Sequence, residues 1–141
     1  MRRIGHGRRS FVRSTVVVDS NVILRYLLAD NQEQHESARR LFDRAMAGQV
    51  AISVPDAVAA ECAYVLLKVY RVPRPEISRS LQSLLSMRGV AASSGMATLQ
   101  ALRTFGQGRI DFVDALVLAV AEANGWEAFS FDHDVAGPSG R

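Results

Sequence analysis

The side chains of this chain best suited to chemistry are four carboxylates in distinct local settings: Asp19, Glu61, Asp114 and Asp132. Asp19 ends the apolar run that begins at Thr15, and Asp132 ends a second apolar stretch over 127–131. Glu61 and Asp114 each interrupt an apolar helical pattern. Burial of a carboxylate is costly unless it is paired or bound to a metal. We therefore expect the four carboxylates to gather around a cation.

The ligand chemistry of these four residues predicts which cation they would hold. Oxygen-only ligands favour hard ions, which here means Mg²⁺ or Mn²⁺. The single cysteine, Cys62, excludes an intrachain disulfide and a cysteine-based zinc site. A carboxylate-held divalent ion commonly activates water and stabilises the leaving oxygen in phosphodiester hydrolysis.

The composition is that of one ordinary globular domain, with 48% apolar and 22% charged residues in 141. No apolar run approaches the roughly 20 residues that span a bilayer. No apolar segment follows the N-terminal arginines as a signal peptide would require. We expect a cytoplasmic protein that does not associate with membranes. Five arginines within residues 1–13 suit a polyanionic partner, although a solvated basic arm explains them equally well.

The hydrophobic patterns predict a flexible basic extension over 1–13, a domain over 14–134 and a short tail over 135–141. Short apolar strands are predicted at 15–18, 50–54, 90–92 and 128–131. Helices are predicted from Ser20 or Asn21 onward, and over 31–47, 55–70, 75–87, 96–105 and 112–123. This alternation predicts an α/β fold, a single domain whose central parallel sheet is flanked by helices on both faces. Ligands of such sheets bind beyond the carboxyl ends of the strands, where Asp19 and Asp132 stand.

Four segments of the sequence together resemble the motifs of the PIN-domain nucleases. They are 16–24 around Asp19, 59–66 around Glu61, 111–116 around Asp114, and 129–132 ending at Asp132. The resemblance is to the VapC-type toxins of bacterial toxin–antitoxin pairs in particular, and it covers residues 15–134. It implies a PIN-like fold and a Mg²⁺- or Mn²⁺-dependent endoribonuclease acting on RNA, usually a homodimer, that a cognate antitoxin protein inhibits.

The resemblance also implies roles for individual residues. Asp19, Glu61, Asp114 and Asp132 match the four catalytic and metal-binding acids of the family. The family also has supporting polar positions that line the pocket of its four acids. These positions match Ser20, Asn21, Asp111 and Ser130. Arginine pairs bidentately with phosphate, which makes a further set candidates for RNA phosphate contacts: Arg25, Arg71, Arg74, Arg103 and Arg109. Each of these arginines taken singly is more often a solvated surface charge.

Structural explanations exist for most of these acids taken alone, but Glu61, whose helical neighbours are apolar, is harder to explain in this way. Asp19, Asp111 and Asp114 are all placed where helix caps and first-turn acids are common. Tyr26 is expected to pack in the core and His35 to face solvent. The occurrence of all four acids in the order of one known architecture nevertheless favours a site over coincidence.

Other functions are compatible with parts of the pattern. A housekeeping RNA-processing PIN nuclease would need no antitoxin, and a catalytically silent PIN-like protein would only bind RNA or serve as a scaffold. A haloacid-dehalogenase-like phosphatase requires a second Asp two positions after Asp19, where Asn21 stands. A DnaQ-like exonuclease would want Glu at that same position, so both of these enzyme classes are disfavoured.

Overall fold

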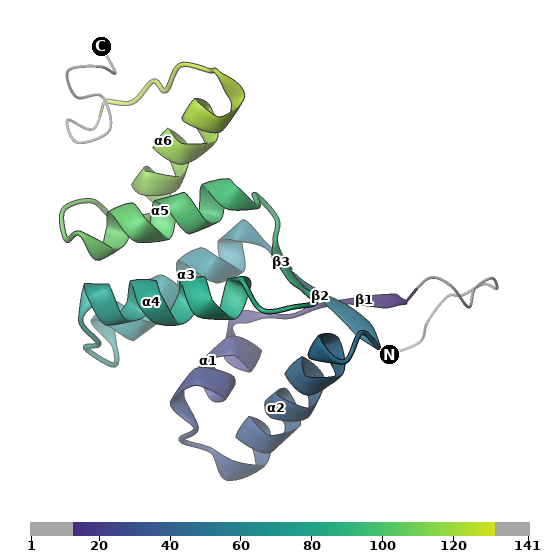
Figure 1. Ribbon diagram of the computed structural model, residues 1–141. Coiled ribbons are helices and arrows are strands. Elements are labelled where there is room, and N and C mark those ends of the chain that lie inside the picture. Colours follow the sequence, from purple (N-terminus) through teal and green to yellow (C-terminus); the bar gives the residue numbers. More distant parts are fainter. Residues whose placement is uncertain (1–12, 132–141) are drawn as a thin grey trace.

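The computed structural model describes residues 13–131, in which strands and helices alternate as the sequence predicts (Figure 1). The strands are β1 (Ser14–Val17), β2 (Val50–Val54) and β3 (Val90–Ala92). The helices are α1 (Ser20–Leu28), α2 (Gln32–Met46), α3 (Asp56–Lys68), α4 (Arg74–Leu85), α5 (Met96–Gly106) and α6 (Phe112–Asn124). The predicted α/β fold is confirmed, and the observed helix ends lie close to the predicted ones. None of the helices in this part of the chain is long and apolar enough to cross a membrane.

The three strands form a parallel sheet in the order β1-β2-β3. Ser14 pairs with Val50, and Ile52 pairs with Val90. Because β2 is the central strand, its residues Val50, Ile52 and Val54 are buried, whereas β1 is largely exposed. The parallel register brings the carboxyl ends of all three strands to one edge, from which α1, α3 and α5 depart.

The helices pack against one another in a continuous series around the sheet. α1 contacts α2 and α3, α4 lies between α3 and α5, and α6 packs mainly on α5. α2 packs on β2, and α4 packs on β3. In Figure 1, α6 lies beyond α5, on the far side of the molecule from β1. The largest side chains in the resulting core come from α2 and α5, where Phe42 and Phe105 are almost completely buried.

The junction of α1 and α2 holds two aromatic residues for which the sequence made separate predictions. Tyr26 packs on Phe42 with ring centroids 4.5 Å apart, which confirms its predicted place in the core. The prediction that His35 faces solvent is wrong. Its ring stacks on Tyr26, and its Nδ1 lies 3.1 Å from the Arg25 carbonyl oxygen, so this residue joins the start of α2 to α1.

Local interactions fix where several helices begin and how closely they pack. The cap of α1 is Asp19, so the helix begins at Ser20, the earlier of the two predicted starts, and Asn31 caps α2. Gly89, between α4 and β3, has φ of 86°, and a Cβ there would lie 2.4 Å from the Ala45 carbonyl oxygen. Only glycine therefore allows the close approach of this turn to α2.

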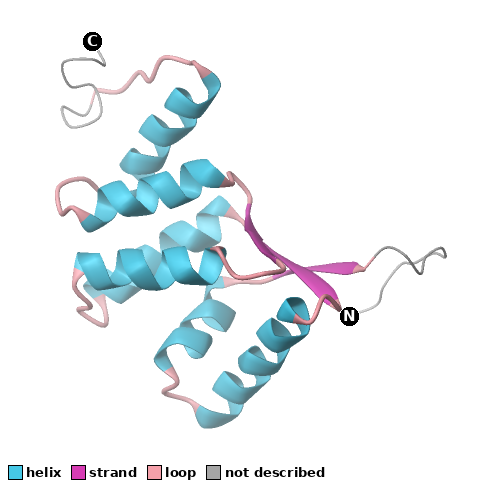
Figure 2. Ribbon diagram, viewed as in Figure 1, coloured by secondary structure: helices cyan, strands magenta, loops and turns pink. Residues whose placement is uncertain are grey.

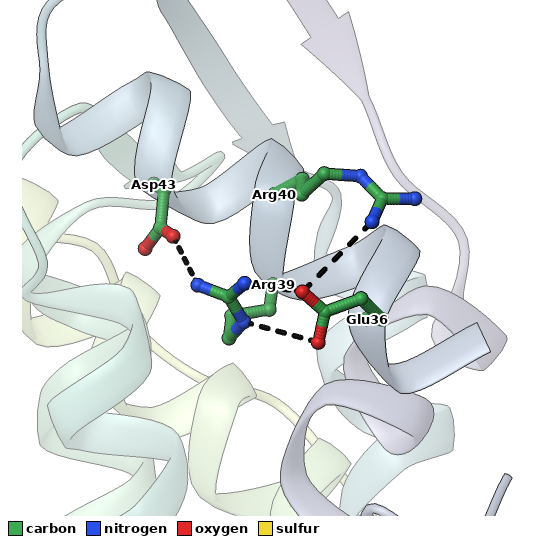
Figure 3. A network of polar contacts seen from close by, with 4 residues as sticks. All are labelled: Glu36, Arg39, Arg40 and Asp43. Carbon is green, nitrogen blue, oxygen red and sulfur yellow. Dashed lines mark hydrogen bonds and ion pairs between the residues drawn. The ribbon is translucent and has the colours of Figure 1, made fainter. Parts of the chain in front are cut away.

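The exposed face of α2 carries a chain of ion pairs that runs along the helix (Figure 3). Arg39 donates to Glu36 and, over 2.7 Å, to Asp43, and Arg40 lies 3.8 Å from Glu36. The Arg39 guanidinium holds the pKa of Glu36 below its ordinary value. These side chains are about half exposed, so each pair contributes little to stability on its own.

The predicted strand over 128–131 is not formed, and the segment after α6 is irregular (Figure 2). Gly125 ends α6 in the left-handed conformation, and the Trp126 N–H donates to the Ala121 carbonyl oxygen over 2.8 Å. This turn reverses the chain, so residues 126–129 lie against α6 instead of reaching the open edge of β1. Phe129 is 81% exposed and Phe131 is 96% exposed, unlike residues of a buried strand.

Candidate functional site

Asp19 lies at the carboxyl end of β1, where the chain leaves the sheet for α1. Its Oδ1 accepts a hydrogen bond from the Val22 N–H over 3.1 Å, so Asp19 is the cap of α1. The explanation of Asp19 as a helix cap is therefore correct. A cap uses one carboxylate oxygen, and the Asp19 side chain is exposed, so its other oxygen is available to a ligand.

Glu61 lies on α3, whose start is held in place by a polar network with the β3–α5 connection. The Asp56 N–H donates to the Ser93 Oγ over 2.9 Å. The Asp56 carboxylate accepts from the Ser94 Oγ over 2.5 Å and from the Thr98 Oγ1 over 3.3 Å. Since Asp56 is in the first turn of α3, these bonds fix the helix that presents the exposed Glu61 side chain.

Cys62 joins the two segments that carry Asp19 and Glu61. Its Sγ lies 3.8 Å from the carbonyl oxygen of Ser20, and the residue is completely buried. Burial raises the pKa of the Cys62 thiol to about 12, and the negative charges of Glu61 and Asp19 add to this effect. Both carboxylates therefore contribute to the electrostatic environment of the same buried thiol. Within residues 13–131, neither forms an ion pair with an arginine or lysine.

Asp114 lies half-buried in the first turn of α6, and a clamp built on Arg74 fixes the start of that helix. The Arg74 guanidinium donates to the carbonyl oxygens of Phe105 and Ile110 over 3.2 and 2.8 Å. It also donates to the Asp111 carboxylate over 3.3 Å and lies over the Phe105 ring. One side chain thus ties the start of α4 to the end of α5 and the start of α6.

The structure brings into contact the two helices, α1 and α3, that lie next to or carry two of the four predicted acids, Asp19 and Glu61. Across the described range, no three Asp, Glu, His or Cys side chains lie close enough to share a metal ion. Asp114 thus does not join a three-acid group with Asp19 and Glu61, and Asp132 lies outside the described residues. The four-carboxylate site stays a prediction, and the contact between Cys62 and Ser20 supports it for Asp19 and Glu61.

The chemistry of this pair fits a hard divalent cation. Mg²⁺ keeps several waters and is usually held by one or two carboxylates together with substrate phosphates. Asp19 and Glu61 supply two exposed carboxylates, and neither forms an ion pair with another residue of the 13–131 range. They are the residues that would hold Mg²⁺ or Mn²⁺.

The supporting residues predicted from the sequence have different settings. Ser20 is the first residue of α1 and is half-buried, and the exposed Asn21 follows it. Asp111 precedes α6 and contacts Arg74, but its side chain does not cap the helix. Ser130 is half-buried in the irregular segment after α6. Ser20 and Asn21 therefore lie next to Asp19, whereas Asp111 and Ser130 belong to the region around α6.

The candidate phosphate-binding arginines also divide into two groups. Arg74 is engaged in the clamp, and Arg25 is held between Asp30 at 3.0 Å and the Tyr70 hydroxyl at 3.2 Å. Arg103 donates to two glutamine side chains. Arg71 and Arg109 are exposed and form no ion pair with another residue of the 13–131 range. These last two are therefore the arginines most accessible to a phosphate.

A pocket of about 320 Å³ between α1 and α2 adjoins Asp19, and we call it the α1–α2 pocket. α1 and the residues before it contribute Asp19, Asn21, Val22 and Arg25, and α2 contributes Gln34, Ser37, Ala38 and Leu41. No role for Gln34 or Ser37 was predicted from the sequence. Their spacing places them on one face of a helix, but no local pattern shows that this face lies opposite Asp19.

A second pocket, of about 380 Å³, is almost wholly apolar and lies between α6 and the segment that folds back on it. Val113 and Val117 line it from α6, and Trp126 and Phe129 line it from the segment. All four side chains are substantially exposed. This surface has no carboxylate from the candidate site and is separate from it.

Comparison with known proteins identifies one family. The family model described as the PIN domain matches residues 16–138, which is most of the chain. A search of curated proteins gives no match.

Proposed function

The chain belongs to the PIN-domain family, whose members are generally nucleases, and from this we propose that it is a metal-dependent endoribonuclease. The observation that supports the proposal is the contact of Cys62, which follows Glu61, with Ser20, which follows Asp19. Within residues 13–131 neither exposed carboxylate forms an ion pair, which favours a bound cation, and a cation held there would attract the phosphates of a nucleic acid.

The proposed chemistry is hydrolysis of an RNA phosphodiester bond. When bound, Mg²⁺ or Mn²⁺ supplies Lewis acidity and an activated water. Asp19 and Glu61 hold the ion, and the Val22 N–H fixes the rotamer of the Asp19 side chain. Asp114 and Asp132 complete the site in this proposal, on the strength of the sequence motifs that they share with the family. Arg71 and Arg109 contact the RNA backbone.

We further propose that this nuclease is the toxin of a toxin–antitoxin pair. The support is the resemblance of the motifs around Asp19, Glu61 and Asp114 to those of VapC-type toxins, together with a family match that spans most of a small chain. The same resemblance supports a homodimer as the active form and a cognate antitoxin as its inhibitor.

The nuclease proposal is tested by incubating the purified full chain with total RNA, in Mg²⁺, in Mn²⁺ and in EDTA, beside Asp114→Asn. We expect discrete fragments in either metal, and none in EDTA or with the variant. Circular dichroism and the melting temperature of Asp114→Asn show whether the variant is folded. Unchanged cleavage by a folded Asp114→Asn, or fragments that persist in EDTA, would contradict the proposal.

The toxin proposal needs a separate experiment. Induced expression of the wild-type chain should arrest growth of a bacterial host, and Asp114→Asn should not. Co-expression of the neighbouring small open reading frame should restore growth, and its product should co-purify with this chain. Normal growth during expression of an active nuclease would leave the nuclease proposal intact and contradict the toxin role.

A further inference from the structure

The α1–α2 pocket has a chemical character that the proposed hydrolytic site does not account for. Val22, Ala38 and Leu41 provide an apolar surface, and Asn21, Gln34 and Ser37 provide two amides and a hydroxyl. Within residues 13–131, no hydrogen bond is formed by the side chains of Asn21, Gln34 or Ser37. The pocket therefore presents unused donors and acceptors beside an apolar wall.

The walls of this pocket are held in fixed positions by contacts outside it. Arg25 is fixed by Asp30 and Tyr70, and His35 joins the start of α2 to the Arg25 carbonyl oxygen. The residues that line the pocket from α2 lie along one face of the helix, and its ion pairs involve other residues (Figure 3). The pocket is thus preformed between two helices that are already joined.

Two charged residues also line the pocket, Asp19 and Arg25, and Arg25 is paired with Asp30. The rest of the lining, an apolar wall with neutral hydrogen-bonding groups, matches a nucleobase better than a phosphate. Asn and Gln side chains present a donor and an acceptor together, which is how proteins pair with base edges. RNA-binding proteins commonly recognise unstacked bases of single strands in this way. The volume of about 320 Å³ is at the lower end of the roughly 300–1,000 Å³ typical of ligand pockets, and suits one nucleoside.

Asp19 is shared by this pocket and by the proposed metal site. A nucleotide whose phosphate lies at Asp19 would therefore have its base within reach of the adjoining pocket. We propose that the α1–α2 pocket binds the unpaired base of a nucleotide next to the cleaved phosphodiester, and that Asn21, Gln34 and Ser37 select that base. This inference rests on the proposed ribonuclease function and adds the residues that determine its sequence preference.

Binding of the base can be measured without catalysis. The side-chain amide signals of Asn21 and Gln34 in the ¹⁵N-labelled full chain are followed by NMR during titration with each nucleoside 5′-monophosphate in EDTA. We expect both signals to shift with at least one nucleotide and to remain unchanged with ribose 5-phosphate, which lacks a base. Equal shifts with ribose 5-phosphate, or no shift with any nucleotide, would overturn the inference.

Two variants test the same assignment through affinity. Gln34→Ala removes one hydrogen-bonding group and should weaken binding of the preferred nucleotide about fivefold. Ser37→Leu fills the pocket and should abolish binding, whereas Ser83→Leu on the exposed face of α4 should not change it. Unaltered affinity in a folded Ser37→Leu would overturn the proposal.

Cleavage mapping separates this inference from the nuclease proposal. If the wild-type chain cleaves RNA, Gln34→Ala should change or relax the base preference next to the cut, while Asp19→Asn should remove cleavage. A wild-type chain that does not cleave RNA contradicts the proposed function, whatever the nucleotide titration shows. A Gln34→Ala variant that cuts at the wild-type positions with the wild-type preference contradicts the pocket assignment alone.

Discussion

The Sγ of Cys62 lies 3.8 Å from the carbonyl oxygen of Ser20, so the residue after Glu61 contacts the residue after Asp19. This contact between α3 and α1 joins the segments that carry two carboxylates far apart in the sequence. The cysteine at the contact is completely buried, and the charges of Glu61 and Asp19 both act on its thiol. Cys62 is thus a reporter of the geometry on which the candidate site depends.

We predict that the Cys62 thiol is unreactive in the folded protein. Its pKa of about 12 leaves almost no thiolate at neutral pH, and the side chain is inaccessible. Iodoacetamide at pH 8 should label the chain only after it is unfolded in guanidinium chloride, as measured by intact mass. Rapid stoichiometric labelling of the native chain would show that the contact between α1 and α3 is not formed as described.

The same raised pKa predicts how stability depends on pH. The unfolded thiol ionises near its ordinary pKa of 9.0, whereas the folded thiol stays protonated up to about pH 12. The unfolded state therefore gains stability as pH rises above 9, and the contribution of Cys62 to folding falls by about 1.4 kcal/mol per pH unit. In urea, Cys62→Ala should have a lower free energy of unfolding than the wild-type chain at pH 7. Between pH 9 and 11, however, its free energy of unfolding should fall less steeply than that of the wild-type chain. An equally steep loss in the variant would contradict the assignment.

Sequence reasoning succeeded where local chemistry determines the structure. The start of α2 and the end of α6 could be predicted from single residues. Asn31 is a favoured residue just before a helix, and Gly125 is a favoured residue just after one. The position of Asp19 directly after a strand was equally readable, although β1 is largely exposed. The local settings of Asp19 and Glu61 could therefore be read from the sequence, while the four-acid site itself stays a prediction.

Long-range relationships could not be predicted in the same way. The apolar residues at 128–131 have a strand-like pattern, but pairing with β1 depends on the turn at Gly125 and on packing against α6. Arg74 was a candidate for an RNA phosphate contact. Its local sequence reads as a turn and gives no sign of the carbonyl groups that its guanidinium contacts in the fold. Gln34 and Ser37 were not predicted as site residues, because the sequence of α2 has the pattern of an ordinary surface helix.

We predict that Gly89 cannot be replaced without a large loss of stability. Gly89→Ala would combine a left-handed φ with a Cβ only 2.4 Å from the Ala45 carbonyl oxygen, and should cost about 3 kcal/mol or more. Gly108→Ala is the matched control, because Gly108 has a similar φ of 91° but nothing within 4 Å of the added Cβ. It should cost only about 1–2 kcal/mol in urea unfolding. Equal losses in the two variants would refute the close approach of this turn to α2.

We predict that Arg74 is structural. Arg74→Lys keeps the charge but removes the planar fork that reaches Phe105, Ile110 and Asp111, and should destabilise the chain by about 2–3 kcal/mol. Arg79→Lys, on the exposed side of the same helix, should change stability by less than about 0.5 kcal/mol. Hydrogen exchange should be faster at the start of α6 in Arg74→Lys. If Arg74→Lys had unchanged stability but bound RNA more weakly, this prediction would be wrong and Arg74 would be a phosphate contact.

The central claim is that Asp19 and Glu61 act together as one metal-binding unit, and a double-mutant cycle on Mg²⁺-dependent RNA cleavage tests it most directly. Asp19→Asn retains a good helix cap and Glu61→Gln changes an exposed side chain, so both variants should remain folded. Each should lower the cleavage rate by more than about a hundredfold, since even outer-shell partners of a metal site are worth roughly 10- to 100-fold. The double variant should be no slower than the slower single variant. Near-wild-type cleavage by either single variant, or losses that multiply in the double variant, would contradict the claim.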